Sequence, residues 1–323
     1  MNRLRNFLQP FVTYGAYPFT LALCLAVCIY AVWRQLDFQA VYGPLVMGLM
    51  AFYLVIELLF PLKREWGMTF QDFIHRDMKF LVLNGVVQGM GQATVGWIAI
   101  TLSLDSKGPL QNVPFYFALP IVFILSEFLH YWYHRLSHEF GGRVGKFLWR
   151  THAAHHLPDR VYVLMHAVGH PLDLLAMNIL MMAILPPLLG CTPDVTFVFV
   201  VISNLHGIVS HLNVDIRAGW LNYIFSLPEV HRYHHSTDVT EAKNYGSVWM
   251  LFDQLFGTFV YRPGELPLQL GVAEPAKYPE STRVFAVLTM PFRPEAPNEN
   301  LSQTGTNATT ENHHRPRSPE SGS

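Results

Sequence analysis

Long stretches of this chain contain no charged residue, and they constrain its fold more than any other feature of the sequence. Four of them lie in the first 126 residues, over 6–33, 38–56, 80–104 and 109–126. Each is close to the roughly 20 residues that a helix needs to cross the ~30 Å hydrocarbon core of a bilayer. Only 14% of the 323 residues are charged, against about 25% in soluble domains. The sequence therefore predicts a membrane protein with four spanning helices in this region.

The first run has a competing interpretation, because Arg3 and Arg5 precede it as basic residues precede a signal peptide. The run is too long for a signal peptide, and no small-residue cleavage site follows it. We therefore favour a spanning helix over a cleaved leader.

The distribution of Lys and Arg predicts the orientation, because short loops rich in these residues stay in the cytoplasm. Three segments that fall on one side of the membrane carry Arg3, Arg5, Lys63, Arg64, Arg76, Lys79, Arg135, Arg143, Lys146 and Arg150. The other side receives only Arg34 and Lys107. We therefore expect a multi-pass protein whose N-terminus and C-terminal half are cytoplasmic.

A second apolar region extends over residues 174–214 and is interrupted by Pro and Gly residues between 186 and 193. Such a break between two apolar arms indicates a helical hairpin, spanning or re-entrant, that leaves and returns to the cytosolic face. His170 and His211 would then lie at the same face. The predicted fold is all-α: a helical membrane bundle of about four spanning helices plus a hairpin, with a histidine-rich cap on the cytosolic side.

Charge and cysteine content exclude several other classes of protein. The formal net charge of −1 provides no basic field for nucleic acid, so we expect no nucleic-acid partner. Cys24, Cys28 and Cys191 lie inside apolar runs and offer neither a disulfide framework nor the CxxC spacing of a metal site.

Histidine is the residue type that carries candidate chemistry, since fourteen of the sixteen histidines fall between His75 and His235. All but His75 form four boxes: His130, His134 and His138; His152, His155 and His156; His166, His170, His206 and His211; and His231, His234 and His235. The i, i+4, i+8 spacing of the first box places three imidazoles along one face of a helix. The second and fourth boxes share the pattern HxxHH.

These boxes indicate metal binding. Imidazole suits iron, zinc, copper and nickel, whereas magnesium and calcium prefer oxygen ligands. A single HxxxH beside a membrane is more often interfacial polarity, but two HxxHH boxes in one chain exceed coincidence. So many uncoordinated imidazoles would also be costly to bury together. The boxes contain enough ligands for two metal ions.

Several stretches around the boxes add to the pattern, namely residues 131–135, 148–152, 170–173, 228–236, 244–246 and 252–259. Together they make residues 127–262 resemble the fatty acid hydroxylase and sterol desaturase superfamily of membrane proteins. We therefore divide the chain into a transmembrane helical region (1–126), a catalytic domain of this kind (127–262), a C-terminal extension (263–290) and a tail (291–323). The tail has almost no apolar residue and is expected to be disordered.

The resemblance implies a di-iron centre and its ligands. The expected ligands are His134, His138, His152, His155, His156, His231, His234 and His235, to which His170 and His211 are added because they match histidines in some branches. His130, Glu127, Asp173 and Asp253 are expected behind the ligands, where carboxylates, also including Glu229 or Asp238, would orient the imidazoles. Asp253 has an equally good interpretation as a structural cap, and His166 and His206 are expected in supporting positions.

By the same resemblance, the two iron ions use O2 to oxidise an unactivated C–H bond of a membrane lipid. The candidate lipids are a sterol, a fatty acyl chain, an ether lipid and the head group of an amino lipid. We favour hydroxylation over desaturation, which the boxes do not separate. No cytochrome b5 domain is fused to the boxes, so we expect electrons from NAD(P)H through a separate protein, a ferredoxin or cytochrome b5 with its reductase.

Other classes of protein fit the sequence less well. A membrane zinc hydrolase would show HExxH, which is absent, and a metal transporter would place ionisable residues within several spans. A zinc protein without redox activity stays open as an alternative. We favour the inner membrane of a bacterium, or the endoplasmic reticulum in a eukaryote.

Overall fold

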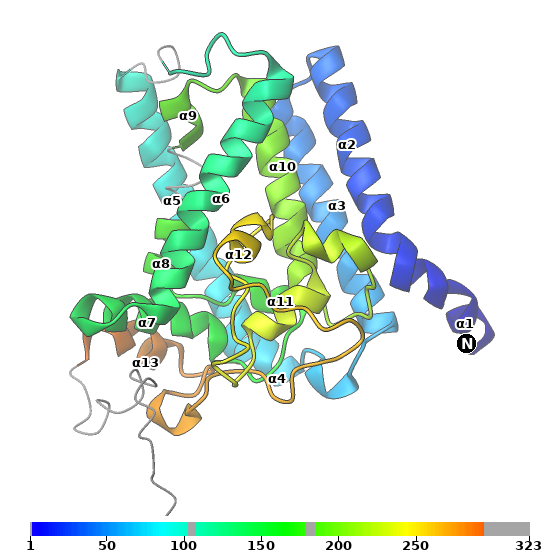
Figure 1. Ribbon diagram of the computed structural model, residues 1–323, viewed down its shortest axis with the longest axis vertical. Helices are drawn as coiled ribbons and strands as arrows, with labels where there is room; N and C mark the ends of the chain where they lie inside the picture. The colour runs from blue at the N-terminus through cyan, green and yellow to red at the C-terminus, as the bar shows by residue number, and fades with distance from the viewer. Residues whose placement is uncertain (1, 103–107, 179–184, 294–323) are drawn as a thin grey trace, which may run out of the picture. The chain divides into compact units, whose positions relative to one another are not determined.

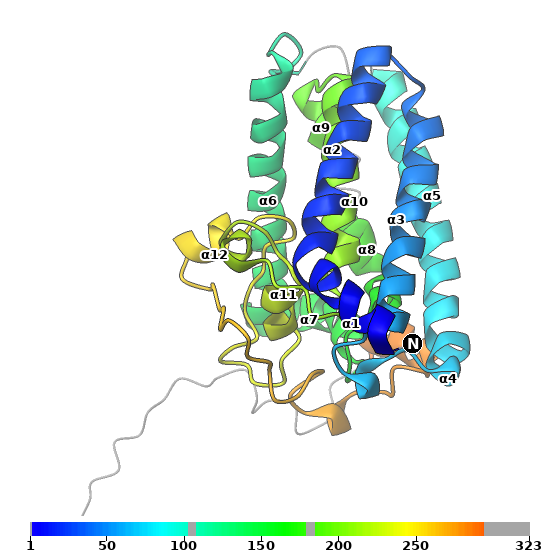
Figure 2. The same cartoon turned by 90° about the vertical axis from the view of Figure 1, so that its right-hand side faces the viewer.

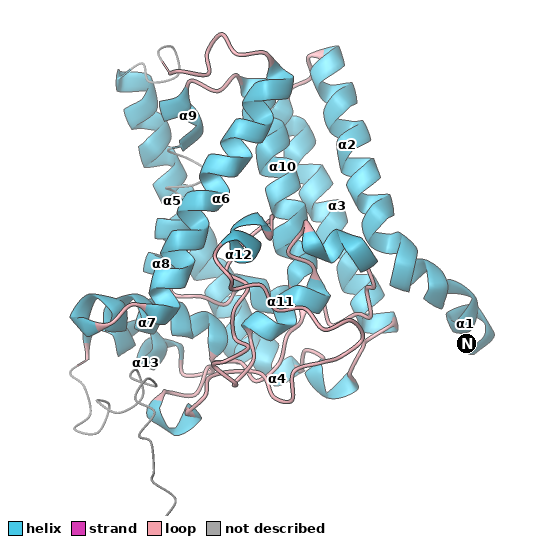
Figure 3. Ribbon diagram, in the orientation of Figure 1, coloured by secondary structure: helices cyan, strands magenta, loops and turns pink. Residues whose placement is uncertain are grey.

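The computed structural model describes residues 2–102, 108–178 and 185–293, which form helices joined by loops with no named β-strand among them (Figure 3). These residues belong to one compact unit. The predicted all-α fold is confirmed.

Four helices are long and apolar enough to cross a membrane. The first candidate span, Arg3–Arg34, contains most of α1 (Asn2–Pro10), the π-helical turn η1 (Phe11–Gly15) and α2 (Ala16–Arg34). The others are α3 (Phe38–Leu59), α6 (Phe115–Glu139) and α10 (Pro193–Ser210). The helices stand side by side in both views (Figures 1 and 2). The chain is therefore a membrane protein built on a helical bundle.

Helix α10 lies at the centre of this bundle and packs against α2, α3 and α6. Pro193 suits its first turn, where no backbone N–H is needed, and Asp194 favours the positive end of the helix dipole. Most side chains between Val195 and Ser210 are buried, as expected for a helix that is apolar on all sides. The core of the bundle thus forms around one arm of the predicted hairpin.

The predicted span over 80–104 corresponds to α5 (Met78–Leu102), although its last two residues lie outside the described residues. Helix α5 is not among the four apolar helices. Its amides lower its hydropathy and bind the protein: Asn84 and Gln88 donate to backbone carbonyls at the start of the hairpin, at 3.0–3.2 Å. The four candidate spans agree in number with the prediction, but they include α10, one arm of the predicted hairpin, and not α5, which still runs from the cap to the other end of the bundle (Figure 2).

The hairpin consists of α8 (Pro171–Asn178), α9 (Leu185–Leu189) and α10, and residues 179–184 lie outside the described residues. Its turn contacts the loop between α5 and α6, where the Leu110 N–H donates to the Leu189 carbonyl at 2.7 Å. That loop lies at the end of the bundle opposite α7 and α11 (Figure 1). The turn of the hairpin therefore lies at the end of the bundle opposite the cap, and its second arm, α10, is a candidate span.

A cap of short helices and loops closes the other end of the bundle (Figure 2). Its helices are η2 (Arg64–Trp66), α4 (Phe70–Asp72), η3 (Phe73–Asp77), α7 (Gly142–His156), η5 (Val163–Ala167), η7 (Gly219–Tyr223), α11 (Pro228–His234), α12 (Leu251–Leu255), η8 (Pro275–Lys277), α13 (Val284–Thr289) and η9 (Met290–Phe292). Helix η9 packs against α7, and Pro291 is buried. The first residues of the predicted tail therefore belong to the fold, whereas 294–323 lie outside the described residues.

Replacing Gly190 with Ala should weaken the hairpin turn. Gly190 has φ +68°, and a Cβ there would lie 2.7 Å from the backbone of Gly108. A left-handed conformation alone costs an L-residue about 1–2 kcal/mol, and the contact adds to that penalty. We expect a clear fall in the thermal unfolding midpoint of the purified protein in detergent. Gly264→Ala is the matched control, since Gly264 has φ +77° but open space around its Cα; an equal fall in both variants would contradict the close packing of the turn.

Candidate metal centres

Nine histidines of the cap form two groups. Site A contains His134, His138, His152, His156 and His234, and site B contains His155, His211, His231 and His235. Within each group, one ring nitrogen from every residue lies within 4.8 Å of the others. The ligands come from the end of α6, the end of α7, the residue after α10 and the region of α11.

The HxxHH spacing divides each box between the two sites. In α7, His152 and His156 are one helical turn apart and belong to site A, whereas His155 belongs to site B. The box at α11 is divided in the reverse way. His231 and His235, one helical turn apart, belong to site B, and His234 belongs to site A. The two boxes therefore bridge the two sites, which explains why each contains three histidines.

Hydrogen bonds at Nδ1 fix the tautomers in site A. The Nδ1 atoms of His134 and His234 lie 2.8 Å and 2.9 Å from the carbonyl oxygens of Tyr245 and Lys243. A carbonyl oxygen can only accept, so both Nδ1 atoms carry the proton and both Nε2 atoms carry a lone pair. His152 has the same arrangement, with Nδ1 3.0 Å from Oδ2 of Asp173.

The lone pairs of site A face one another. Nε2 of His152 lies 3.0 Å from Nε2 of His134 and 3.0 Å from Nε2 of His156. Two nitrogens without a proton cannot hydrogen-bond to each other. The buried Nε2 atoms of His138 and His234 also have no hydrogen-bond partner in the described part of the chain. A cation between these nitrogens would satisfy all of them.

Site B brings its ring nitrogens equally close together, but a close carbonyl contact fixes the tautomer of His155 alone, and the Nδ1 atoms of His231 and His235 have no partner in the described part of the chain. Nε2 of His211 lies 2.9 Å from Nε2 of His155 and from Nε2 of His231, and 3.3 Å from Nε2 of His235. Nδ1 of His155 is 2.8 Å from the Val168 carbonyl, so its Nε2 is again unprotonated. Ligands bonded to one ion at about 2.0–2.1 Å lie about 2.9 Å apart at a right angle and about 3.4 Å apart at the tetrahedral angle. The observed spacing therefore fits one metal ion in site B.

Burial lowers the pKa values of several cap histidines. It lowers the pKa of His155 to about 3, and it holds the pKa values of His156, His211, His234 and His235 well below their usual range. Lowered pKa values mean that these rings are unprotonated, and able to coordinate, at neutral pH.

Asp173 supports site A through His152. Burial alone would raise the pKa of this carboxyl, but His152 and the hydroxyl of Tyr133 hold it below its usual value. The Tyr133 hydroxyl donates to Oδ1 at 2.9 Å, and Oδ2 faces His152. The carboxylate is thus ionised and fixed from both sides.

Two other expected carboxylates contact no imidazole. Glu127 accepts the backbone N–H groups of residues 247–249 at 3.0–3.3 Å, and Asp253 accepts those of Tyr245 and Gly246 at 2.7–2.8 Å. Both hold the loop whose Tyr245 carbonyl meets His134. Glu229 and Asp238 likewise bond to the cap backbone and its polar side chains.

The remaining histidines lie outside both groups. His170 has backbone partners at both ring nitrogens, the Leu288 carbonyl at 3.0 Å and the Leu172 N–H at 3.2 Å, so we leave it out of the ligand set. The ring of His130 lies 5.4 Å from that of His134, and the ring of His166 lies 5.0 Å from that of His211. His206 bonds within the bundle to Tyr17.

Some supporting groups had no signal in the sequence. The carbonyls of Tyr245, Lys243 and Val168 orient three imidazoles, and backbone atoms leave no residue pattern. Trp149 packs its ring 5.1 Å from that of His138 and donates to the Tyr278 hydroxyl at 2.7 Å. In the sequence, the only feature that pointed to this tryptophan was its position in the 148–152 stretch.

Replacing Asp173 with Asn should weaken metal binding at site A. The change removes the negative charge behind His152, and loss of such a partner typically reduces metal affinity about 10- to 100-fold. Titration of metal-depleted protein with iron or cobalt, followed spectroscopically, measures the affinity of each site. Asp238→Asn, at an exposed carboxylate of the cap, is the control; equal affinity in both variants would rule out the supporting role.

Comparison with known proteins agrees with this geometry. The profile described as fatty acid hydroxylase matches residues 119–258, a range that contains all nine histidines. No solved structure matches the chain at a significant level.

Characterised relatives include hydroxylases and monooxygenases. The ornithine lipid hydroxylase OlsE of Rhizobium tropici is 33% identical over 245 residues, which cover 72% of this chain and 70% of the relative. Alkylglycerol monooxygenase of Homo sapiens is 30% identical over 138 residues, 42% of this chain and 29% of the relative. Methylsterol monooxygenase 2-2 of Arabidopsis thaliana is 26% identical over 139 residues, 42% and 50% of the two chains. The chain therefore belongs to the fatty acid hydroxylase and sterol desaturase superfamily of membrane oxidoreductases.

Proposed function

We propose that this protein is a membrane-bound, O2-dependent lipid hydroxylase whose nine cap histidines hold two iron ions, one in site A and one in site B. The observation that carries the proposal is the convergence of ring nitrogens at 2.9–3.3 Å in both sites, where Nδ1 partners leave the Nε2 atoms of His134, His152, His234 and His155 without a proton. The kinship with hydroxylases and monooxygenases supports iron and O2 over zinc without redox activity.

Two bound iron ions would supply the reduction of O2 and the removal of a hydrogen atom from an unactivated C–H bond. The chain itself orients the imidazoles through Asp173 and the cap carbonyls, and it keeps water away, since His152, His156 and His234 are at most 2% exposed. Electrons then come from NAD(P)H through a separate redox protein.

The substrate is a membrane lipid. The match to the ornithine lipid hydroxylase extends over 245 residues and so includes helices outside the histidine-bearing block, whereas the matches to the alkylglycerol and methylsterol enzymes cover 42% of the chain. Bundle helices are the part of such a protein that contacts lipid. We therefore favour an amino-acid lipid over a sterol, a fatty acyl chain or an ether lipid.

Removing one ligand from each site should abolish activity. His155→Ala takes a ligand from site B, and His234→Ala takes one from site A. We expect each variant to lose one of two bound irons and its turnover to fall about 100-fold or more. Losing a residue that merely orients a ligand already reduces activity about 10- to 100-fold, and losing the ligand itself should cost at least as much. Iron content by mass spectrometry, and a lipid shifted by about 16 mass units in cells that express the intact protein, are the measurements.

Two histidines outside the groups are the controls. His75→Ala changes an exposed ring, and His170→Ala changes a ring held by backbone groups, so both variants should retain two irons and activity. A lipid shifted by two mass units downward would replace hydroxylation by desaturation. Full activity in the His155 and His234 variants, or zinc as the only metal bound, would refute the proposed function.

We further propose that the cap lies in the cytoplasm, at the inner membrane of a bacterium. Single cysteines test this orientation, because Cys24, Cys28 and Cys191 are buried. Leu36→Cys, in the loop between α2 and α3, should react with a membrane-impermeant maleimide in intact spheroplasts, and Asp238→Cys should react only after lysis. The reverse pattern would overturn the orientation.

A further inference from the structure

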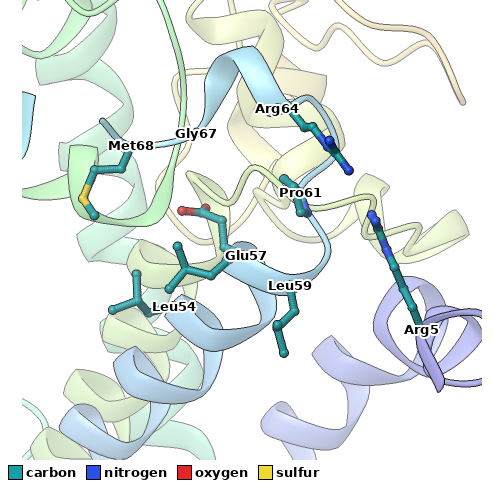
Figure 4. A pocket seen from close by; sticks show the side chains of 9 residues that line it. Arg5, Leu54, Glu57, Leu59, Pro61, Arg64, Gly67 and Met68 are labelled. Atoms are coloured by element: carbon teal, nitrogen blue, oxygen red, sulfur yellow. The ribbon is translucent and has the colours of Figure 1, made fainter. Parts of the chain in front are cut away.

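A pocket of about 300 Å³ lies where the end of α3 meets α1 and the loop that contains η2, as Figure 4 shows. It is lined by Arg5, Leu54, Glu57, Leu58, Leu59, Pro61, Arg64, Gly67 and Met68. The volume is within the range of small-ligand sites. None of these residues belongs to site A or site B, so the metal chemistry does not account for the pocket.

Glu57 places an unpartnered carboxylate oxygen at this pocket. Its side chain is only 5% exposed, and Oε2 accepts the backbone N–H groups of Val163 and Asn213, both at 2.9 Å. Oε1 has no hydrogen-bond partner in the described part of the chain. Oε1 is not among the fully enclosed polar atoms that lack a partner, so it is open to the pocket, where a donor can reach it. A ligand with N–H groups would supply that donor.

Arg5 and Arg64 supply the opposite charge at the same pocket, and their guanidinium groups lie on the same side of Pro61, across it from the Glu57 carboxylate (Figure 4). Neither guanidinium group forms an ion pair within the described residues. The guanidinium carbon of Arg5 lies over the ring of Phe60, 5.9 Å from its centroid. Two unpaired guanidinium groups form a site for an anionic group such as a phosphate or a carboxylate.

The surroundings of the pocket are apolar and exposed. Leu58 and Leu59 are 63% and 58% exposed, and Phe7 on α1 is 78% exposed. They lie at the ends of two candidate spans, where such side chains contact acyl chains and arginines contact head groups. The occupant that fits is therefore a lipid and not a water-soluble metabolite.

We propose that this pocket binds the head group of a lipid that carries both an anionic group and a primary ammonium. The anion lies between Arg5 and Arg64, and the ammonium donates to Oε1 of Glu57. Two lipid classes have this chemistry: phospholipids with an ethanolamine head group, and amino-acid lipids with a free carboxylate and a free amine. Glu57 also holds Asn213, two residues after the site B ligand His211, so the head-group site adjoins the metal region through one short segment.

Lipid binding to the purified full-length protein tests this proposal without any turnover. Native mass spectrometry would measure binding of an ethanolamine phospholipid, an ornithine-containing lipid, a choline phospholipid and a glycerol phospholipid with matched acyl chains. The choline head group has no N–H donor, and the glycerol head group has no cation. We expect at least one of the first two lipids to bind about 10-fold more tightly than the last two, the effect of one charge-assisted hydrogen bond.

The two halves of the site can be separated with variants. Glu57→Gln keeps an acceptor for Val163 and Asn213 but removes the charge, and it should abolish the preference for the ammonium. Arg5→Gln with Arg64→Gln should weaken binding of every anionic lipid about 10-fold or more. Arg34→Gln, at the other end of the first candidate span, is the matched control and should leave the binding of every lipid unchanged. If Glu57→Gln does not fold, a series of ethanolamine head groups with one to three added methyl groups tests the same contact in the unaltered protein.

Each outcome decides the proposal. Preference for the ethanolamine lipid alone identifies a phosphate as the anion, and preference for the ornithine lipid alone identifies a carboxylate. Equal binding of all four lipids, a preference for the ammonium that survives in Glu57→Gln, or unchanged binding in the arginine double variant would overturn it. Iron content measured in the same samples keeps this result separate from the proposed function, because the head-group site requires no metal.

Discussion

The cap depends on the orientation of nine imidazoles toward two points. Ring nitrogens that face one another at 2.9–3.3 Å without protons repel, and groups behind four of the rings hold them in this orientation. Those groups are the carbonyls of Tyr245, Lys243 and Val168 and the carboxylate of Asp173. A cation in each group would relieve this repulsion, so metal binding at these sites would be coupled to folding of the cap.

Buried charged residues hold the loops that carry these orienting groups. Glu127 on α6 accepts three backbone N–H groups of the loop beyond Tyr245, and Glu57 on α3 accepts those of Val163 and Asn213. Arg232 donates from α11 to the carbonyls of Leu212 and Val214, and burial lowers its pKa to about 10, so it stays charged at neutral pH. Irregular backbone can lie at the end of a membrane bundle because such side chains satisfy its polar groups.

Much of the fold was predictable, because long apolar runs and the Pro/Gly break have direct structural meaning. The lower hydropathy of α5 has a reason that was not predictable, since Asn84 and Gln88 could be interpreted as tolerated polar residues until their carbonyl partners were placed. The boxes supplied enough ligands for two ions. Their division between sites A and B depends on how α7 and α11 face each other, which is a tertiary property. The role of Glu127 was predicted wrongly for the same reason. A carboxylate near a histidine box can accept backbone N–H groups as readily as it accepts an imidazole N–H.

Helix α6 shows how the membrane part and the metal part become one structure. It begins in an apolar segment and ends with His134 and His138, so the domain boundary that we placed after residue 126 falls inside a single helix. A rigid helix transmits position better than a loop, and a site built on such elements holds its ligands more closely to one geometry. The candidate spans α6 and α10 both lead directly to ligands, at His138 and His211, and α3 leads to Glu57. The depth of the bundle in the bilayer therefore fixes the height of both sites, and with it which part of a lipid can reach them.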